Sequence, residues 1–317
     1  MSEPSTVCAR VNNVAGMTFH VVVGAGPVGA ATARLLAESG DDVRVVTRRG
    51  TGPSHERIEL VAADATTQLT PLTSGAATLI NCASPPYDRL PEETPALSAA
   101  LLAAAEKSGA AYLNLSNTYG YGPVDGPQTD DLPMRPTTIK GRVRASMYLD
   151  GLAAHEAGRV RFAEVRPADF IGAGAVSMFT LLISAPVLAG QDVVFAGDLD
   201  APHSWSYTGD AARTLVAVAR SSESWGRAWH TPSASDLSVR AIAARFAEVA
   251  GVPARQVREM TALELHTAAL ADPIMAETTE MQYLYQRSTV LDWSGTAAMF
   301  DLKPTPLDDV LRELAAA

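Results

Sequence analysis

The chain has 317 residues, of which 47% are hydrophobic and 19% are charged, and its formal net charge is −10. That length and composition suit a folded protein with one α/β domain and an added smaller lobe. An acidic balance without a dense Lys/Arg run argues against binding to nucleic acid or to an anionic membrane surface.

No segment predicts export or membrane insertion. Residues 1–16 lack the apolar core of a signal peptide, and we expect them to form a disordered tail. The apolar run Ala175–Gly190 is shorter than a bilayer span of about 20 residues and contains Pro186, so we expect a buried helix. Two cysteines, Cys8 and Cys82, give no disulfide or metal framework. We therefore expect a cytoplasmic protein.

Strand-like and helix-like segments alternate along the first half of the chain. The predicted strands are Thr18–Val23, Asp42–Arg48, a run ending at Asp64, Ala77–Ser84, Ala111–Asn117 and Val160–Pro167. The predicted helices between them include the segment ending at Gly40, Pro95–Gly109 and Lys140–Ala157. Such alternation predicts an α/β fold with a doubly wound, parallel Rossmann sheet covered by helices on both faces.

A second, smaller lobe is expected after residue 170, where the alternation loosens. The predicted helices Leu237–Val252 and Thr261–Leu270 and the tail Pro306–Ala315 belong to it. We assign residues 17–170 to the dinucleotide-binding domain, with a returning segment near 205–235. Residues 171–204 and 236–317 then form the substrate-binding lobe.

A glycine turn follows the first strand. Gly24-Ala25-Gly26-Pro27-Val28-Gly29 fits G-x-G-x-x-G between a strand and a helix. Gly24 permits the tight turn, Gly26 lets the backbone approach a pyrophosphate, and Gly29 lets the helix pack closely. The helix start, with Pro27 and Val28, then presents free N–H groups to the phosphates. A plain strand–helix turn is the structural alternative.

The second strand ends in basic residues. An acid at its end would bind the adenosine ribose, whereas arginine favours a 2′-phosphate. Here Thr47 is followed by Arg48 and Arg49, so we predict NADPH, with NADH possible, and Arg48 as the clamp. Both arginines could instead be solvated surface charges. Asp64 either contacts the adenine edge or is a turn residue.

The ordered motifs resemble an extended short-chain dehydrogenase/reductase, related to the NAD-dependent epimerases and dehydratases. The resemblance covers nearly the whole chain after Met17. It rests on GAGPVG, NCASPP (Asn81–Pro86), NTYGYGP (Asn117–Pro123), DLPMRP before a helix, RPADFIGAG (Arg166–Gly174) and WSYTGDAART (Trp205–Thr214). It implies a nicotinamide-dependent oxidoreductase in which Cys82, Ala83 and Ser84 pass over the cofactor, and Pro167, Ala168 and Asp169 lie against the nicotinamide.

The family's catalytic pair is missing. Its tyrosine falls at Lys140 and its lysine at Arg144, while its Ser or Thr falls at Asn117, beside Ser116. Three routes to a proton remain open. Lys140 could be the acid if a hydrophobic site lowers its pKa. Ser116, Asn117 or Tyr121 could donate a hydrogen bond to the carbonyl. The substrate could stabilise its own alkoxide, with a water completing the transfer.

Arg144 cannot act as an acid near neutral pH, but it can bind ribose or substrate oxygens. Lys140 and Arg144 could also be the solvated start of a basic helix. The pattern KGRVRA with NTYGYGPVDG is similar to an atypical branch of the extended group, some of whose members are ketoreductases that tailor aromatic polyketide antibiotics such as angucyclinones.

The remaining candidates have ordinary structural interpretations. Cys82 suits small strand-end packing better than redox chemistry. His203, His230 and His266 lack metal-ligand spacing, so we predict no metal site. Trp205, Tyr207, Trp293 and the run Met281–Gln286 could line an apolar pocket or pack in the core.

We therefore expect an NADPH-dependent ketoreductase acting on a bulky, largely apolar carbonyl compound, as a monomer or homodimer. One alternative is a sugar-nucleotide epimerase or dehydratase that retains NAD⁺. Another is a non-catalytic dinucleotide sensor that binds partners, which the missing tyrosine would equally allow.

Overall fold

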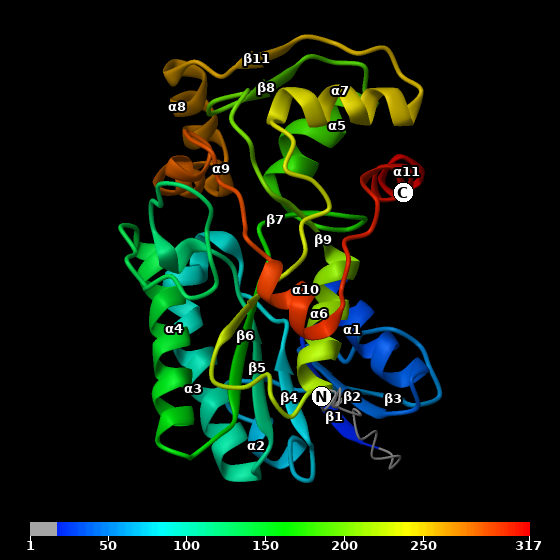
Figure 1. Cartoon of the computed structure of the whole chain (residues 1–317), viewed down its shortest axis with the longest axis vertical. Coiled ribbons are helices and arrows are strands. Elements are labelled where there is room, and N and C mark those ends of the chain that lie inside the picture. Colours follow the sequence, from blue (N-terminus) through cyan, green and yellow to red (C-terminus); the bar gives the residue numbers. More distant parts are fainter. Residues whose placement is uncertain (1–17) are drawn as a thin grey trace, which may run out of the picture.

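The computed structural model describes residues 18–317, so the predicted tail at 1–16 lies outside the described residues. Seven parallel strands form the central sheet in the order β10-β6-β5-β4-β1-β2-β3 (Figure 1). Their bounds are β1 Phe19–Val23, β2 Asp42–Thr47, β3 Ile58–Ala62, β4 Thr78–Asn81, β5 Ala111–Leu115, β6 Phe162–Arg166 and β10 Ala228–His230. The predicted doubly wound α/β class is confirmed.

Helices cover both faces of this sheet because its strands are apolar on both sides. Val22 packs in a cluster with α1 (Pro27–Glu38) and α6 (Thr208–Arg220) on one face. Val21 and Val23 point the other way, into a cluster with α3 (Leu90–Ser108) and α4 (Ile139–Glu156). Figure 1 shows the two helix pairs on opposite sides of the strands. The carboxyl ends of the strands all face the second lobe.

The second lobe has its own hydrophobic core, which includes Phe179, Trp205 and Phe246. Two small parallel ribbons run through it, β7–β9 and β8–β11. The ribbon strands are β7 Asp169–Ile171, β8 Val193–Phe195, β9 Trp205–Tyr207 and β11 Val257–Glu259. The lobe helices are α5 Ala185–Leu188, α7 Val239–Ala250, α8 Ala262–Ala271, α9 Pro273–Thr278 and α11 Leu307–Ala316.

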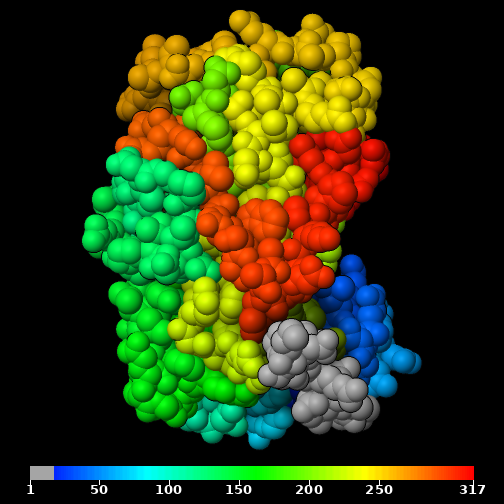
Figure 2. Space-filling model, in the orientation of Figure 1, coloured from blue at the N-terminus to red at the C-terminus, as the bar shows by residue number. Residues whose placement is uncertain are grey.

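The chain crosses between the two parts several times. The segment from α6 through β10 returns to the sheet, where α6 packs on one face and β10 pairs with β6. The C-terminal region differs from the predicted division, because α10 (Ser294–Phe300) leaves the lobe and packs beside β10, where the Phe300 and Trp229 rings lie 4.8 Å apart. In the space-filling view this region bridges the two parts on one face (Figure 2).

The apolar run at residues 175–190 is helical but not fully buried. A π-helical turn at Thr180–Ser184 precedes α5. Leu181 and Leu188 are 44% and 42% exposed, so the expectation of a buried helix is wrong for one of its faces. One face of the segment packs in the lobe core through Phe179, Ile183 and Val187, while Leu181 lines a cavity. Within residues 18–317, no helix is both long and apolar enough to cross a membrane.

Candidate active site

A cavity of about 580 Å³ lies between the carboxyl edge of the sheet and the second lobe. Its walls combine the glycine turn, the ends of β4, β5 and β6, and apolar side chains of the lobe. The lobe residues on its wall include Val176, Met178, Leu181, Ile274, Met281 and Leu284. The same cavity therefore joins the predicted cofactor site to an apolar chamber.

The three glycines of the turn have distinct steric surroundings. A Cβ on Gly29 would lie 2.1 Å from the carbonyl oxygen of Gly24, so only glycine lets α1 start this close to β1. Gly24 has φ +93°, and a Cβ there would lie 2.7 Å from the Ala83 nitrogen. A Cβ on Gly26 would meet no atom within 4 Å. The open space beside Gly26, at the N-terminus of α1, fits the close approach of a dinucleotide pyrophosphate.

The predicted wall residues of the cofactor lie along this cavity. Gly26, Pro27, Val28, Gly29, Cys82, Ala83, Ser84, Pro167, Ala168 and Asp169 all line it. Burial raises the pKa of the Cys82 thiol to about 12, which keeps it protonated and unreactive at neutral pH. This agrees with the packing interpretation of Cys82.

The adenosine end of the predicted site lies outside the cavity. Arg48 and Arg49 are exposed directly after β2, where both interpretations, phosphate clamp and solvated charge, remain compatible with the structure. Asp64 forms a turn, with its Oδ1 accepting hydrogen bonds from the Thr66 nitrogen and hydroxyl at 2.9 and 2.7 Å. These bonds lower the pKa of Asp64. A contact between Asp64 and adenine stays a prediction.

Three of the five predicted catalytic residues come together in the cavity. Ser116, Asn117 and Arg144 line it. Arg144 is 7% exposed, and its Nη2 donates to the Ser84 hydroxyl at 3.2 Å. Among residues 18–317, the Arg144 Nε and the Ser116 Oγ are buried polar atoms without a hydrogen-bond partner. Because such atoms are costly to leave unpaired, they fit a site that binds the oxygens of a ligand.

Tyr121 is not in the cavity, which corrects its predicted place beside the reacting carbonyl. Its hydroxyl accepts from the Arg166 Nη1 at 2.7 Å and pairs with the His230 Nε2 at 2.7 Å. Arg166 also donates to Glu164 at 2.7 Å, and His230 Nδ1 contacts the Asp292 carbonyl at 2.8 Å. Tyr121 therefore belongs to a buried polar network that ties β6 to β10.

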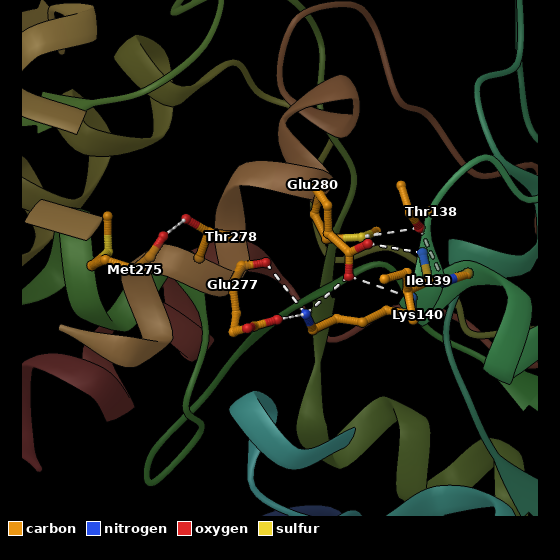
Figure 3. Close-up of polar contacts among 9 residues, drawn as sticks. Thr138, Ile139, Lys140, Met275, Glu277, Thr278 and Glu280 are labelled. Atoms are coloured by element: carbon orange, nitrogen blue, oxygen red, sulfur yellow. Dashed lines mark hydrogen bonds and ion pairs between the residues drawn. The ribbon is translucent and has the colours of Figure 1, made fainter. Parts of the chain in front are cut away.

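Lys140 is also outside the cavity, which corrects the prediction that it surrounds the carbonyl as a donor. Its side chain is 0% exposed, and its ammonium lies between Glu277 and Glu280 of the second lobe (Figure 3). The distance to the Glu280 Oε1 is 2.9 Å. The ammonium also lies 4.8 Å from the centroid of the Tyr87 ring. Two carboxylates flank this ammonium, so the hydrophobic environment needed for a lysine acid is not present.

The start of α4 is thus a junction between the two lobes. Glu280 also accepts from the backbone nitrogens of Ile139 and Lys140 at 2.8 and 3.3 Å (Figure 3). An acidic side chain at a helix N-terminus satisfies free N–H groups and complements the helix dipole. The alternative interpretation of a solvated basic helix start holds for Arg142, which is exposed, and is wrong for Lys140 and Arg144.

Sequence reasoning missed an aromatic and polar group on the opposite wall. The Asp169 carboxylate accepts from the Tyr285 hydroxyl at 2.6 Å and contacts the His203 Nε2 at 3.0 Å. Tyr87 and Tyr119 complete this wall. Burial raises the pKa of Tyr87 to about 12, and it also raises the pKa values of Tyr119 and Tyr285 well above the usual value of a tyrosine.

The amino-acid sequence contains signals for parts of this wall. Tyr285 lies in the aromatic run 281–286, which was a pocket candidate, and Tyr119 lies in the motif from which Tyr121 was chosen. Of the other aromatic candidates, Trp205 is 0% exposed in the lobe core. The pairing of Asp169 with His203 had no local signal, because 34 residues separate them.

Comparison with known proteins identifies the family of the chain. The family model of the NAD-dependent epimerase/dehydratase family matches residues 20–229, and the chain belongs to that family. Among curated proteins, none matches the sequence significantly.

Solved structures resemble the whole chain. A double mutant of the dTDP-glucose 4,6-dehydratase DesIV from Streptomyces venezuelae, with NAD and DAU bound, has 20% identity and a TM-score of 0.76, covering 95% of this chain and 96% of its own. MoeE5 in complex with UDP-glucuronic acid and NAD has 20% identity and a TM-score of 0.77, covering 95% and 98%. WbmH of Bordetella bronchiseptica in complex with NAD⁺ has 19% identity and a TM-score of 0.74, covering 95% and 98%. At these identities the likeness shows the fold.

The chain is thus an NAD(P)-dependent enzyme of the epimerase/dehydratase family with a Rossmann-type domain. Its residues fit a nicotinamide dinucleotide, since the space at Gly26 is open and the unpaired Ser116 and Arg144 atoms lie on the same cavity wall. The glycine turn would hold the pyrophosphate, and Arg144 with Ser116 would bind ribose or substrate oxygens. When bound, the nicotinamide of such a cofactor would accept or supply hydride.

Proposed function

We propose that this enzyme is an NADPH-dependent ketoreductase that reduces a carbonyl group of a bulky, largely apolar small molecule. The compound could be an intermediate of an aromatic polyketide antibiotic, as the sequence resemblance suggests. The observation that carries the proposal is the composition of the part of the cavity wall that the second lobe forms. Between residues 170 and 317, the side chains that line the cavity include no lysine or arginine.

This wall favours an uncharged substrate over a sugar nucleotide. A diphosphate carries negative charges, whose burial requires cationic or hydrogen-bonding partners. Among the described residues that line the cavity, Arg144 is the one lysine or arginine, and it lies on the cofactor side. Val176, Met178 and Leu181 instead offer apolar area to a substrate of about the cavity's size.

The site can hold a nicotinamide cofactor beside a substrate carbonyl, but it lacks the family's usual tyrosine and lysine. A developing alkoxide must be stabilised by other groups. Arg144 and Ser116 suit this role because their unpaired polar atoms are buried at the cavity wall. Lys140, which stands at the position of the family's tyrosine, does not reach the cavity and so does not take over the role of that tyrosine.

Cofactor preference tests the proposal directly. Fluorescence titration of the purified protein should show reversible binding of NADPH in preference to NADH. Arg48→Ala should weaken NADPH binding by about 10- to 100-fold, because a charge-assisted hydrogen bond contributes about 1.5–3 kcal/mol, and leave NADH binding nearly unchanged. Arg49→Ala is the matched control.

The other outcomes distinguish the alternatives. Copurified NAD⁺ that resists exchange would favour the sugar-nucleotide epimerase or dehydratase, a class to which the structural neighbours DesIV and UDP-galactose 4-epimerase belong. Reversible NADPH binding without oxidation by any of a panel of aromatic ketones would favour a dinucleotide sensor.

A further inference from the structure

We propose that Asp169 and His203 form an acid–base dyad in which the His203 Nδ1 gives the proton to the reduced carbonyl oxygen. The inference rests on the proposed ketoreductase function and replaces the missing tyrosine with residues from another part of the chain. Both residues line the cavity, as do Pro167 and Ala168, which follow β6 on its cofactor side.

The fold itself brings the two residues together. Strands β7 and β9 are paired so that Asp169 lies opposite Trp205, and His203 precedes Trp205 by two residues. The backbone at Ala168 is fixed by a 2.9 Å hydrogen bond from its nitrogen to the Ser206 hydroxyl. The carboxylate and the imidazole therefore meet at the carboxyl edge of the sheet, where ligands bind in this class of fold.

The hydrogen bonds of His203 give one ring nitrogen a partner and leave the other ring nitrogen available to the substrate. The His203 Nε2 lies 3.0 Å from the Asp169 Oδ2, so its N–H donates to the carboxylate. Within residues 18–317, the hydrogen bond of the His203 ring is the one made by Nε2. A carboxylate that holds one nitrogen and stabilises the imidazolium, while the second nitrogen serves the substrate, is the arrangement of an acid–base histidine.

The ring is also held rigidly, as proton transfer requires. It stacks on Tyr285 with a centroid distance of 5.2 Å and an interplanar angle of 27°, and it lies 4.6 Å from the Trp205 ring. Tyr285 donates to the same Asp169 oxygen at 2.6 Å. Among the described residues, the titratable side chains that hydrogen-bond to or stack on the His203 ring are Asp169 and Tyr285.

Other groups on the cavity wall are poorer proton donors. The tyrosines Tyr87, Tyr119 and Tyr285 are buried phenols whose pKa values are raised, which makes proton loss harder. Arg144 keeps its charge near neutral pH. Histidine is the residue type whose proton is exchanged near neutrality.

The step balances without another reactant. The carbonyl carbon accepts hydride, with its electron pair, from the reduced nicotinamide. The C=O π pair moves to the oxygen, which forms an O–H bond with the proton leaving Nδ1. The imidazolium becomes neutral imidazole, and solvent restores its proton after the alcohol leaves.

The first test measures NADPH oxidation by wild type, His203→Gln and Asp169→Asn with an aromatic ketone that wild type reduces. We expect kcat of His203→Gln to fall about 100-fold or more, as for loss of a general acid, with NADPH binding unchanged. Wild-type kcat should decline at alkaline pH, and this limb should be absent in His203→Gln. His266→Gln changes an exposed histidine on α8 and serves as the control.

The second test needs neither turnover nor a folded variant. Nitrogen-15 NMR of the wild-type protein without cofactor should show neutral His203 as the Nε2–H tautomer. A neutral Nδ1–H tautomer, or a His203→Gln enzyme that binds NADPH and keeps at least a third of wild-type kcat, would overturn the dyad. If wild type reduces no ketone, the ketoreductase proposal fails, while the tautomer still decides the dyad's geometry.

Discussion

Replacing Lys140 by methionine should destabilise the protein by removing an ion-pair contact between its two lobes. The substitution keeps most of the aliphatic stem and removes the ammonium that holds Glu277 and Glu280. It also removes the cationic contact with the Tyr87 ring at 4.8 Å. Two carboxylates would then face each other without a counter-charge.

The expected magnitude follows from the exposure of the partners. Breaking a fully buried ion pair costs about 3–5 kcal/mol, whereas exposed pairs contribute about 0–1 kcal/mol. Here the lysine side chain is 0% exposed, while those of Glu277 and Glu280 are 36% and 25% exposed. Water can therefore solvate the carboxylates in part, and we expect a loss of about 2 kcal/mol. For a chain of this size, that lowers Tm by about 4 °C.

The assay is equilibrium unfolding in urea followed by circular dichroism, with thermal unfolding as a second probe. Arg142→Met is the matched control, because Arg142 is an exposed cation on the same helix. Glu277→Gln in the Lys140→Met background should restore part of the loss, since it removes one of the uncompensated charges. A Lys140→Met protein within about 0.5 kcal/mol of wild type would refute the assignment of Lys140 as a stabilising contact between the lobes.

Two further predictions concern glycines and pH. Gly26→Ala should fold as stably as wild type but bind NADPH at least about 10-fold more weakly, because its Cβ would occupy open space beside the pyrophosphate. Gly29→Ala should lose about 1–3 kcal/mol of stability, because its Cβ would lie 2.1 Å from a carbonyl oxygen. Equal melting temperatures for the two variants would contradict this. Burial lowers the pKa of His230 to about 4, so below about pH 6.5 the unfolded chain takes up a proton that the folded protein excludes. Stability should therefore fall by about 3 kcal/mol as pH drops from about 6.5 to 4, with the lowered pKa of His20 acting in the same direction. Urea unfolding measured across this range gives the free energy of unfolding as a function of pH. The slope of that plot should correspond to about one proton fewer in His230→Gln than in wild type.

The sequence by itself determined the fold class and the glycine turn before α1, because both depend on local signals. Alternating apolar strands and amphipathic helices specify a parallel sheet, and Gly24, Gly26 and Gly29 are fixed by steric needs within a few residues of one another. It also located the wall residues around Cys82 and Pro167, since strand ends in such a sheet point to one edge.

Only the tertiary structure decided which side chains face the cavity. Lys140 and Tyr121 stand within motifs typical of a catalytic centre, but contacts with Glu277, Glu280, Arg166 and His230 turn both side chains away from it. These partners lie 45 to 140 residues away in the sequence, so no local pattern reveals them. The pairing of Asp169 with His203 likewise depends on the register of β7 and β9. The sequence predicts where the chain turns, whereas long-range packing determines what each polar atom contacts.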